Sequence, residues 1–314
     1  MTDAVVVFGA GGFIGRNLVE TLRGRVRHLF GVTAAGRAVE GCELTVSAAD
    51  LAALPPLPRR TAIFHVAAHR YRATHFAAEQ ASILAANLGL TDLVYRFARE
   101  RDIREIRAAS SAAVYPAEWA VLDDSRPLDL NAWPHDGEAA YAWSKRWGEI
   151  AAELWHRHAG INTISFRLTS PYGRFDTLDA AEAHVATAFA IRALDHAPEF
   201  IVAGDPEAER DFVFAADVGA AFVASLSLSG VQTAVNCAFG QTTRIAALAH
   251  AAMRAAGHER PLRTDPALGD GGSAVKIRHA TATRMRRLLP ELPDFRPLDD
   301  GMRETVAWYR DALG

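Results

Sequence analysis

Residues 5–22, VVVFGAGGFIGRNLVETL, place four glycines within seven positions, between a run of β-branched residues and an apolar helical pattern. Glycine destabilises strands and helices alike, so this concentration indicates a requirement other than stability. Backbone amides at the start of a helix can receive a pyrophosphate only where no Cβ blocks its approach. The spacing Gly9-x-x-Gly12-x-x-Gly15, one residue longer than G-x-G-x-x-G, predicts a dinucleotide site that also includes Phe13 and Ile14. The alternative for this stretch alone is a tight strand–helix connection that binds nothing.

The first half of the chain alternates between short apolar runs and helical patterns. Such alternation predicts parallel strands joined by helical crossovers, hence an α/β fold with a doubly wound parallel sheet of the Rossmann type. We predict strands at 5–8, 27–33, 43–47, 61–67, 105–109 and 162–168, and helices at 12–22, 79–101 and around 141–158. Further along, short strands are expected at 211–214 and 234–239, and the closing amphipathic helix is expected to be capped by Asp299 or Asp300. We therefore predict a dinucleotide-binding domain over 1–168, to which 211–240 return, and a smaller C-terminal substrate-binding lobe over 169–314.

Composition excludes several classes of function. The 314 residues are 50% apolar and 23% charged, with a net charge of −3, as expected of a globular protein of enzyme size. The absence of a basic stripe or a polybasic flank predicts no nucleic-acid partner and no membrane association. Two isolated cysteines, Cys42 and Cys237, form neither a disulfide framework nor a zinc pattern, and they predict a reducing, cytoplasmic location.

The residues after the second predicted strand bear on the choice of dinucleotide. A dinucleotide site that prefers NAD places an Asp or Glu roughly 20 residues beyond the glycines, on the ribose 2′-hydroxyl. Here Thr33 ends the strand, no acid occurs before Glu40, and Arg37 lies close by. The missing carboxylate and the nearby guanidinium favour NADP, with NAD as the alternative if Arg37 is a solvated loop residue and Thr33 or the backbone binds the ribose.

A candidate catalytic set follows in the segments IREIRAASSAAVYP and YAWSK. Tyr141 and Lys145 stand four residues apart, so both project from one face of a helix. A phenol is a poor acid or base near neutral pH, and a neighbouring ammonium favours the phenolate and brings the phenol pKa into a useful range. Ser111 stands at the carboxyl end of a predicted strand, where open α/β sheets bind their ligands, and its hydroxyl can orient a reacting oxygen beside Tyr141.

Longer segments extend this pattern over nearly the whole chain: FHVAA at 64–68, SFRLTSPYG at 165–173, GDPEAERDFVFAADV at 204–218, VNCAFG at 235–240 and DDGMRETVAWY at 299–309. Together with the glycine turn they resemble an extended short-chain dehydrogenase/reductase of the NAD-dependent epimerase/dehydratase family, which acts mainly on nucleotide sugars. The resemblance implies that Ser111, Tyr141 and Lys145 form the catalytic triad. It also assigns to the cofactor site Ala67, Ala68 and Asn87, and it implies a homodimer formed through the helices that carry Asn87 and Tyr141.

The same resemblance assigns the substrate side of the site. Arg210 matches the family's diphosphate-binding arginine, and Ser170 replaces the family's asparagine, which leaves open a substrate that is not a nucleotide sugar. His184 matches a histidine of the GDP-fucose synthase-like ketoreductases, with a solvent-facing polar residue as the alternative. Arg70 and Arg72 either add to an anionic pocket or lie in an ordinary exposed loop. His65 is expected to be a structural histidine rather than an acid or base.

Departures from the family pattern narrow the reaction. Sugar dehydratases carry an acidic pair where this chain has Ala112 and Ala113, and GDP-fucose synthase carries a cysteine at Ala112, so dehydration and double epimerisation are disfavoured. We therefore predict NADP(H)-dependent reduction of a keto group, at C4, on a nucleotide-activated deoxysugar. The alternatives are an NAD(P)-dependent nucleotide-sugar 4-epimerase and, from another class, a catalytically silent dinucleotide-binding sensor or scaffold.

Overall fold

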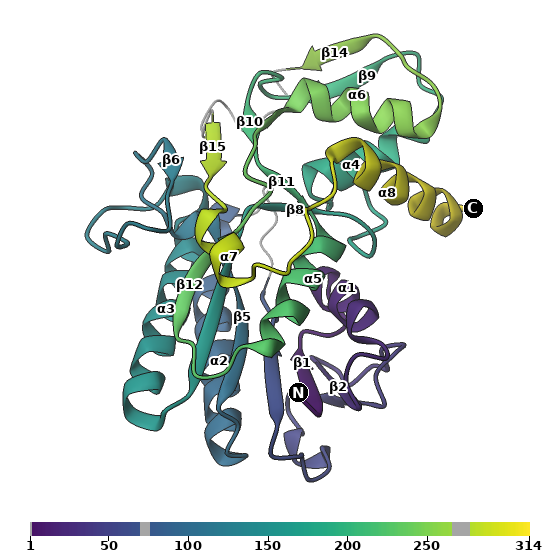
Figure 1. Cartoon of the computed structure of the whole chain (residues 1–314). Coiled ribbons are helices and arrows are strands. Elements are labelled where there is room, and N and C mark those ends of the chain that lie inside the picture. The colour runs from purple at the N-terminus through teal and green to yellow at the C-terminus, as the bar shows by residue number, and fades with distance from the viewer. Residues whose placement is uncertain (1, 70–75, 266–276) are drawn as a thin grey trace.

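The computed structural model describes residues 2–69, 76–265 and 277–314 (Figure 1). Seven parallel strands form its central sheet, in the order β12-β7-β5-β4-β1-β2-β3. They are β1 (Ala4–Phe8), β2 (His28–Thr33), β3 (Leu44–Ser47), β4 (Thr61–His65), β5 (Glu105–Ser111), β7 (Asn162–Leu168) and β12 (Thr233–Cys237). The strand order reverses between β1 and β4, which is the point where doubly wound sheets bind their ligands. The predicted fold class is confirmed.

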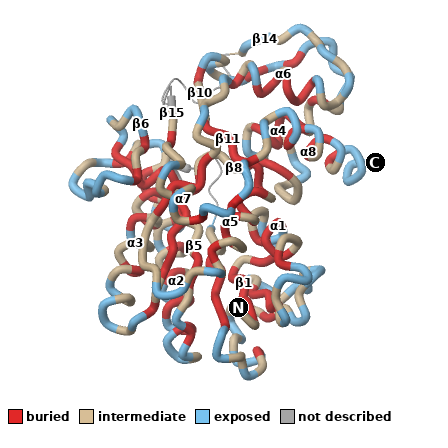
Figure 2. The backbone as a smooth tube through the Cα atoms, viewed as in Figure 1, coloured by how far each residue is buried: buried red, intermediate tan, exposed pale blue. Residues whose placement is uncertain are grey.

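Helices cover both faces of this sheet. In β1, Val5 and Val7 pack in a cluster that includes residues of α1 (Phe13–Leu22) and α5 (Ala215–Ala224). The alternate residues Val6 and Phe8 pack in a second cluster with α2 (Phe76–Glu100) and α3 (Ala139–Ala159). Because successive strand residues point to opposite faces, a continuous apolar run is what a strand buried on both faces requires. Figure 2 shows the resulting buried strands between more exposed helices.

The C-terminal part of the chain builds a smaller unit beyond the carboxyl ends of the strands (Figure 1). Its core lies among three helices, α4 (Val185–Ala193), α6 (Ile245–Ala256) and α8 (Leu298–Leu313), and the strand pair β9 (Phe200–Ala203) and β14 (Leu262–Asp265). A four-stranded sheet has the order β13-β10-β15-β6. Its strands are β6 (Val121–Leu122), β10 (Glu209–Arg210), β13 (Thr243–Arg244) and β15 (Ile277–Ala280). The remaining elements are the paired β8 (Ser170–Tyr172) and β11 (Phe212–Phe214), helix α7 (Thr283–Leu288), and short 3₁₀ turns at Leu51–Ala53, Ala112–Val114, Asp136–Glu138 and Ser225–Ser227.

Several predicted boundaries differ from the structure. The strand predicted at 61–67 ends at His65, so the next residues are free to form a loop at the sheet's carboxyl edge, whereas the strand predicted at 105–109 continues to Ser111. The predicted cap of the closing helix is wrong: Pro297 is the N-cap residue, and Asp299 and Asp300 lie in the first turn. Carboxylates are also favourable there, because they face the positive end of the helix dipole. Within the described residues, no helix is long and apolar enough to span a lipid bilayer. The division into domains at residue 168 stays a prediction.

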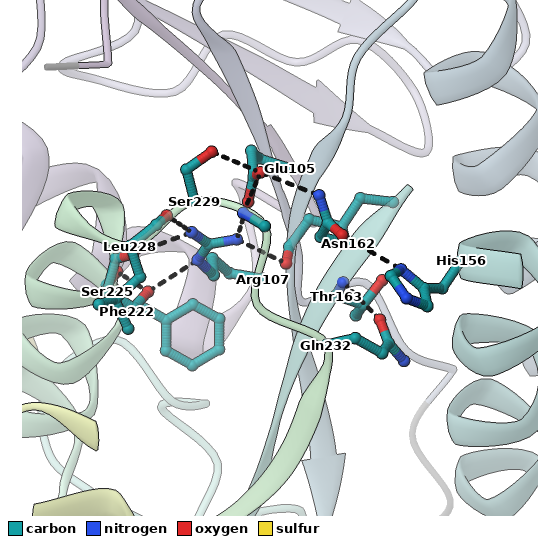
Figure 3. Close-up of polar contacts among 12 residues, drawn as sticks. Glu105, Arg107, His156, Asn162, Thr163, Phe222, Ser225, Leu228, Ser229 and Gln232 are labelled. Atoms are coloured by element: carbon teal, nitrogen blue, oxygen red, sulfur yellow. Dashed lines mark hydrogen bonds and ion pairs between the residues drawn. The ribbon is translucent and has the colours of Figure 1, made fainter. Parts of the chain in front are cut away.

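A buried arginine, Arg107, stabilises the edge of the sheet at which the amino ends of the strands lie (Figure 3). Arg107 lies in β5 with its side chain 1% exposed, and it donates to Ser225 Oγ at 3.0 Å, to Ser225 O at 2.9 Å and to Leu228 O at 2.6 Å. It also donates to Glu105 Oε2 at 3.0 Å, while Glu105 Oε1 accepts from Asn162 Nδ2 at 3.1 Å. These bonds tie β5 and β7 to the turn that leads into β12.

Candidate active site

One large cavity, of about 1570 Å³, lies at the carboxyl ends of the central strands and extends under the C-terminal unit. Most of the predicted site residues line it, although they are spread over 200 positions of the sequence. Those that line it are Gly9, Gly12, Phe13, Ile14, Thr33, Arg37, Ala67, Ala68, Ser111, Tyr141, Lys145, Ser170, His184 and Arg210. Gly15 and Asn87 are not among the lining residues, and Arg70 and Arg72 lie outside the described residues.

The glycine turn forms a cradle that side chains would fill. Gly9 has a φ of +91°, and a Cβ on it would lie 2.6 Å from the backbone nitrogen of Ala67. A Cβ on Gly15 would lie 1.9 Å from the carbonyl oxygen of Gly9, so this glycine permits close packing rather than contact with a ligand. Gly12 is the N-cap residue of α1, and neither a capping side chain nor an acidic residue occupies the first turn. The exposed amides and the helix dipole therefore fit the pyrophosphate of a dinucleotide.

The adenosine end of the cavity lies beside β2 and the loop that follows it. Thr33 and Arg37 both line this end, and Arg37 is exposed. Glu40, the first acid after Thr33, lies in an ion pair with Arg23 at 2.9 Å. Arg16, which the sequence interpretation missed, also lines the cavity, with its guanidinium 4.1 Å from the ring centroid of Phe175. Arg16, Arg37 and Glu40 thus all line the cavity, and the Glu40 carboxylate is paired with Arg23.

Helix α3 carries the Tyr–Lys pair to the cavity. Lys145 Nζ lies 5.5 Å from the ring centroid of Tyr141 and donates a hydrogen bond to Ala109 O at 2.8 Å. Burial of Lys145 lowers its pKa to about 8. The side chain therefore remains mostly protonated at neutral pH, and its positive charge is close enough to favour the phenolate form of Tyr141.

Ser111 is the last residue of β5 and lines the same cavity as Tyr141. Its Oγ accepts a hydrogen bond from the backbone nitrogen of Ala113 at 3.1 Å, which fixes the oxygen and leaves the hydroxyl proton to be donated. Ala112 and Ala113 follow it, buried and lining the cavity. No proton-transfer group therefore stands at those two positions.

His65 lies buried at the end of β4, 8% exposed. Burial, with the nearby charge of Lys145 as a smaller cause, lowers its pKa to about 3. The imidazole is consequently uncharged at physiological pH, which disfavours a role as general acid; its structural role stays a prediction.

The C-terminal unit supplies the other wall of the cavity. Ser170 lies in β8, Arg210 in β10, and His184 is the N-cap residue of α4. His184 Nδ1 lies 2.9 Å from Asp176 Oδ2, and the imidazole is 5.9 Å, centroid to centroid, from the ring of Phe13 beside the glycine turn. His184 lines the cavity, and 46% of its side chain is exposed. Its contact with a substrate stays a prediction.

The model of the NAD dependent epimerase/dehydratase family matches residues 5–238. The chain belongs to this family. It is 27% identical to a dTDP-4-dehydro-6-deoxy-D-allose reductase from Streptomyces sp., over 98% of this chain and 96% of the relative. It is 21% identical to a GDP-L-fucose synthase from Dictyostelium discoideum, over 72% of this chain and 70% of the relative. Among solved structures it resembles a UDP-glucose 4-epimerase from Thermotoga maritima, with a TM-score of 0.83, 20% identity and coverage of 99% of this chain and 100% of that chain.

Membership of the epimerase/dehydratase family confirms the predicted enzyme class, an NAD(P)-dependent oxidoreductase or epimerase of the extended short-chain type. Asn87, which was expected at the cofactor, holds the loop after β4: its side chain accepts from His69 N at 2.8 Å and donates to His69 O at 3.2 Å. A contact of Asn87 with the cofactor stays a prediction.

Besides Arg16, the sequence interpretation missed three residues in or near the site. Glu149 lies two helical turns after Tyr141 and forms a buried ion pair with Arg167 at 2.7 Å, which holds α3 against β7. A helical spacing of eight from Tyr141 was the signal that could have revealed Glu149. Glu138 and Arg278 line the cavity and pair with each other, but 140 positions separate them and no motif contains both.

Proposed function

We propose that this protein is an NADP(H)-dependent reductase of a keto group, at C4, on a nucleotide-activated deoxysugar. The observation that carries the proposal is the full-length similarity to the dTDP-4-dehydro-6-deoxy-D-allose reductases, at 27% and 26% identity. The cavity supports it, because the glycine cradle, the Tyr–Lys pair and a second wall with arginine side chains line one space. Ala112 and Ala113 further disfavour dehydration, which needs proton-transfer groups at those positions.

The chain's own residues supply the acid chemistry of such a reduction. A bound NADPH supplies the hydride. As the carbonyl oxygen gains negative charge, Tyr141 donates its proton to that oxygen, and the Ser111 hydroxyl donates a hydrogen bond to it. Lys145 lowers the cost of the resulting phenolate and can hold a ribose hydroxyl. On the opposite wall, Arg210 binds the substrate's diphosphate and so fixes the carbonyl within reach of the hydride.

The preference for NADP is part of the proposal. Arg16 and Arg37 line the adenosine end of the cavity, and the nearest acid along the chain, Glu40, is paired with Arg23. A 2′-phosphate would gain attraction from both arginines, whereas an NAD ribose would lack the carboxylate that usually binds its 2′-hydroxyl. His184 and Ser170 are proposed to contact the sugar or its diphosphate.

The decisive experiment is incubation of the purified protein with NADPH and a panel of nucleotide 4-keto-6-deoxysugars. Reduction consumes one NADPH for each product molecule, as followed at 340 nm and by mass spectrometry. Isomer formation without added cofactor would instead support the 4-epimerase alternative. Tyr141→Phe separates enzyme from scaffold, since it should abolish turnover while cofactor affinity persists; unchanged turnover would contradict the proton-donor role.

We also propose a homodimer in which α2 and α3 of two copies pack together. Trp147 and Leu154, seven residues apart on α3, are 42% and 43% exposed and form part of one apolar helical face. Light scattering should give a dimer for the wild type and a monomer for Trp147→Glu. A monomeric wild type at micromolar concentration would refute this assembly.

A further inference from the structure

Two arginines stand side by side on the wall opposite the catalytic helix. Arg210 of β10 and Arg278 of β15 are register partners on neighbouring parallel strands, and both line the cavity. Register partners in a sheet project to the same face, about 5 Å apart. Their guanidinium groups therefore extend from adjacent positions of one small sheet into the same space.

Arg278 is also tied to the catalytic helix. Its Nη1 lies 3.1 Å from Glu138 Oε2 and its Nη2 lies 3.0 Å from Glu138 Oε1, a two-pronged ion pair between side chains that are 20% and 26% exposed. Glu138 is the N-cap residue of α3, three positions before Tyr141. The ion pair thus connects a strand of the C-terminal unit to the first turn of the helix that carries the proton donor.

This arrangement leaves Arg278 able to bind a second anion. A guanidinium has five N–H donors, and a two-pronged carboxylate contact occupies two of them. The carboxylate also holds the guanidinium in one orientation, so less side-chain entropy is lost when a further ligand binds. Planar guanidinium groups suit phosphate oxygens, and two adjacent ones suit the paired phosphates of a diphosphate.

We propose that Arg278 is a second anchor for the substrate's diphosphate beside Arg210, and that Glu138 links this anchor to the first turn of α3. The inference rests on the proposed function, from which it takes a nucleoside diphosphate as the anionic group. The diphosphate binds to the Arg278–Glu138 pair as it stands, and through Glu138 it is connected to the start of α3 near Tyr141. Arg278 is therefore a substrate-binding residue and Glu138 a positioning residue.

Ligand binding tests the anchor separately from turnover. With the cofactor site saturated by NADP⁺, calorimetry measures the affinities for dTDP, UDP and GDP and for the corresponding nucleosides. For the tightest diphosphate, Arg278→Gln should weaken binding about 10-fold or more, Arg278→Lys should weaken it less, and nucleoside binding should not change. The matched control is Arg244→Gln on the neighbouring strand β13, 61% exposed and not part of the cavity lining, which should stay within about twofold of the wild type.

The outcomes separate this inference from the function on which it rests. If the wild type binds a nucleoside diphosphate and Arg278→Gln binds it equally well, the Arg278 anchor is refuted and the proposed function survives. If the wild type binds none of the three diphosphates, both are refuted.

A double-mutant cycle on kcat tests the link to α3. Glu138→Gln should lower kcat about 10-fold while the diphosphate affinity stays within about threefold of the wild type, which a residue that only supports folding would not produce. Because the two residues act as one unit, the double variant with Arg278→Gln should have a kcat no lower than that of the slower single variant. Effects on kcat that multiply in the double variant would overturn the link, and circular dichroism at the assay temperature verifies that every variant is folded.

Discussion

Replacing Lys145 by methionine should show how much the desolvated charge of Lys145 lowers the stability of the folded protein. Lys145 lies half-buried in the wall of the cavity, and burial lowers its pKa from 10.5 to about 8. Methionine has a similar length and no charge, so it removes the desolvated ammonium with little change in packing. Lys145→Met should lose turnover, because the charge beside Tyr141 is gone, and its stability should depend on pH differently from that of the wild type.

The size of this difference follows from proton linkage. Between pH 8 and pH 10.5 the unfolded wild type binds the Lys145 proton and the folded protein does not, so wild-type stability rises with pH over that window. Conversely, the contribution is lost as the pH falls through 8, where the folded protein must bury the charge. With these two pKa values, the Lys145 contribution to the free energy of unfolding increases by about 2 kcal/mol from pH 7 to pH 9.5. The methionine variant lacks this increase, so any stability advantage it has at pH 7 should shrink by about 2 kcal/mol at pH 9.5.

Urea unfolding of the cofactor-free protein at pH 7, 8, 9 and 9.5 measures this effect. The quantity to compare is the difference between variant and wild type, because titrating groups that do not interact with Lys145 then cancel. Ser111→Ala is the matched control, since it should also lower turnover but keeps the ammonium and removes no titrating group, and its difference from the wild type should change little between pH 7 and 9.5. A Lys145→Met difference that is the same at pH 7 and pH 9.5 would refute the argument that the charge is desolvated.

Three other substitutions test the remaining structural claims. Gly15→Ala should lower the free energy of unfolding by about 2 kcal/mol or more and abolish dinucleotide binding, because its Cβ would lie 1.9 Å from the Gly9 carbonyl oxygen. The control Gly148→Ala, whose Cβ would lie 3.9 Å from its nearest neighbour, should be neutral or stabilising in thermal unfolding. Equal effects of the two substitutions would contradict the close approach at Gly15. Arg37→Ala should narrow the gap between NADPH and NADH affinities in fluorescence titrations, and equal affinities in the wild type would refute the NADP preference. Arg107→Ala should lower the free energy of unfolding, measured with urea, by about 3 kcal/mol, and substitution of the exposed Arg104 by alanine should lower it by about 0.5 kcal/mol. A decrease below about 1 kcal/mol for Arg107→Ala would show that the buried hydrogen bonds of Arg107 contribute little to stability.

The parts of the site that the sequence predicts are those built from short local patterns. The glycine turn, the i,i+4 pair of Tyr141 and Lys145, and Ser111 at a strand end are each contained within a few residues. The parallel sheet then brings them together, because the carboxyl ends of its strands meet at one edge. For these residues, knowledge of the fold class is enough to predict that they surround one cavity.

Contacts made across the fold are not predictable in this way. Glu138 and Arg278 meet because a short strand of the C-terminal unit runs beside the start of α3, and nothing near either residue marks the other. The predicted cap of α8 was wrong for a different reason. Aspartate is favoured both as a cap and in the first helical turn, so its presence indicates a helix start without fixing the position of the first residue.

Arg107, which is buried, and Lys145, which is half-buried on the cavity wall, differ in how their hydrogen-bond donors are used. Arg107 uses all five of its N–H donors, on Glu105, on its own strand and on the turn before β12. Lys145 has three donors, and the described part of the chain gives it one acceptor, Ala109 O. A buried charge whose donors are all hydrogen-bonded stabilises the fold. A charge on a cavity wall that has unused donors can instead donate hydrogen bonds to a bound ligand. Oxygen atoms of a ligand beside Lys145 would therefore recover part of the free-energy cost of burying its charge.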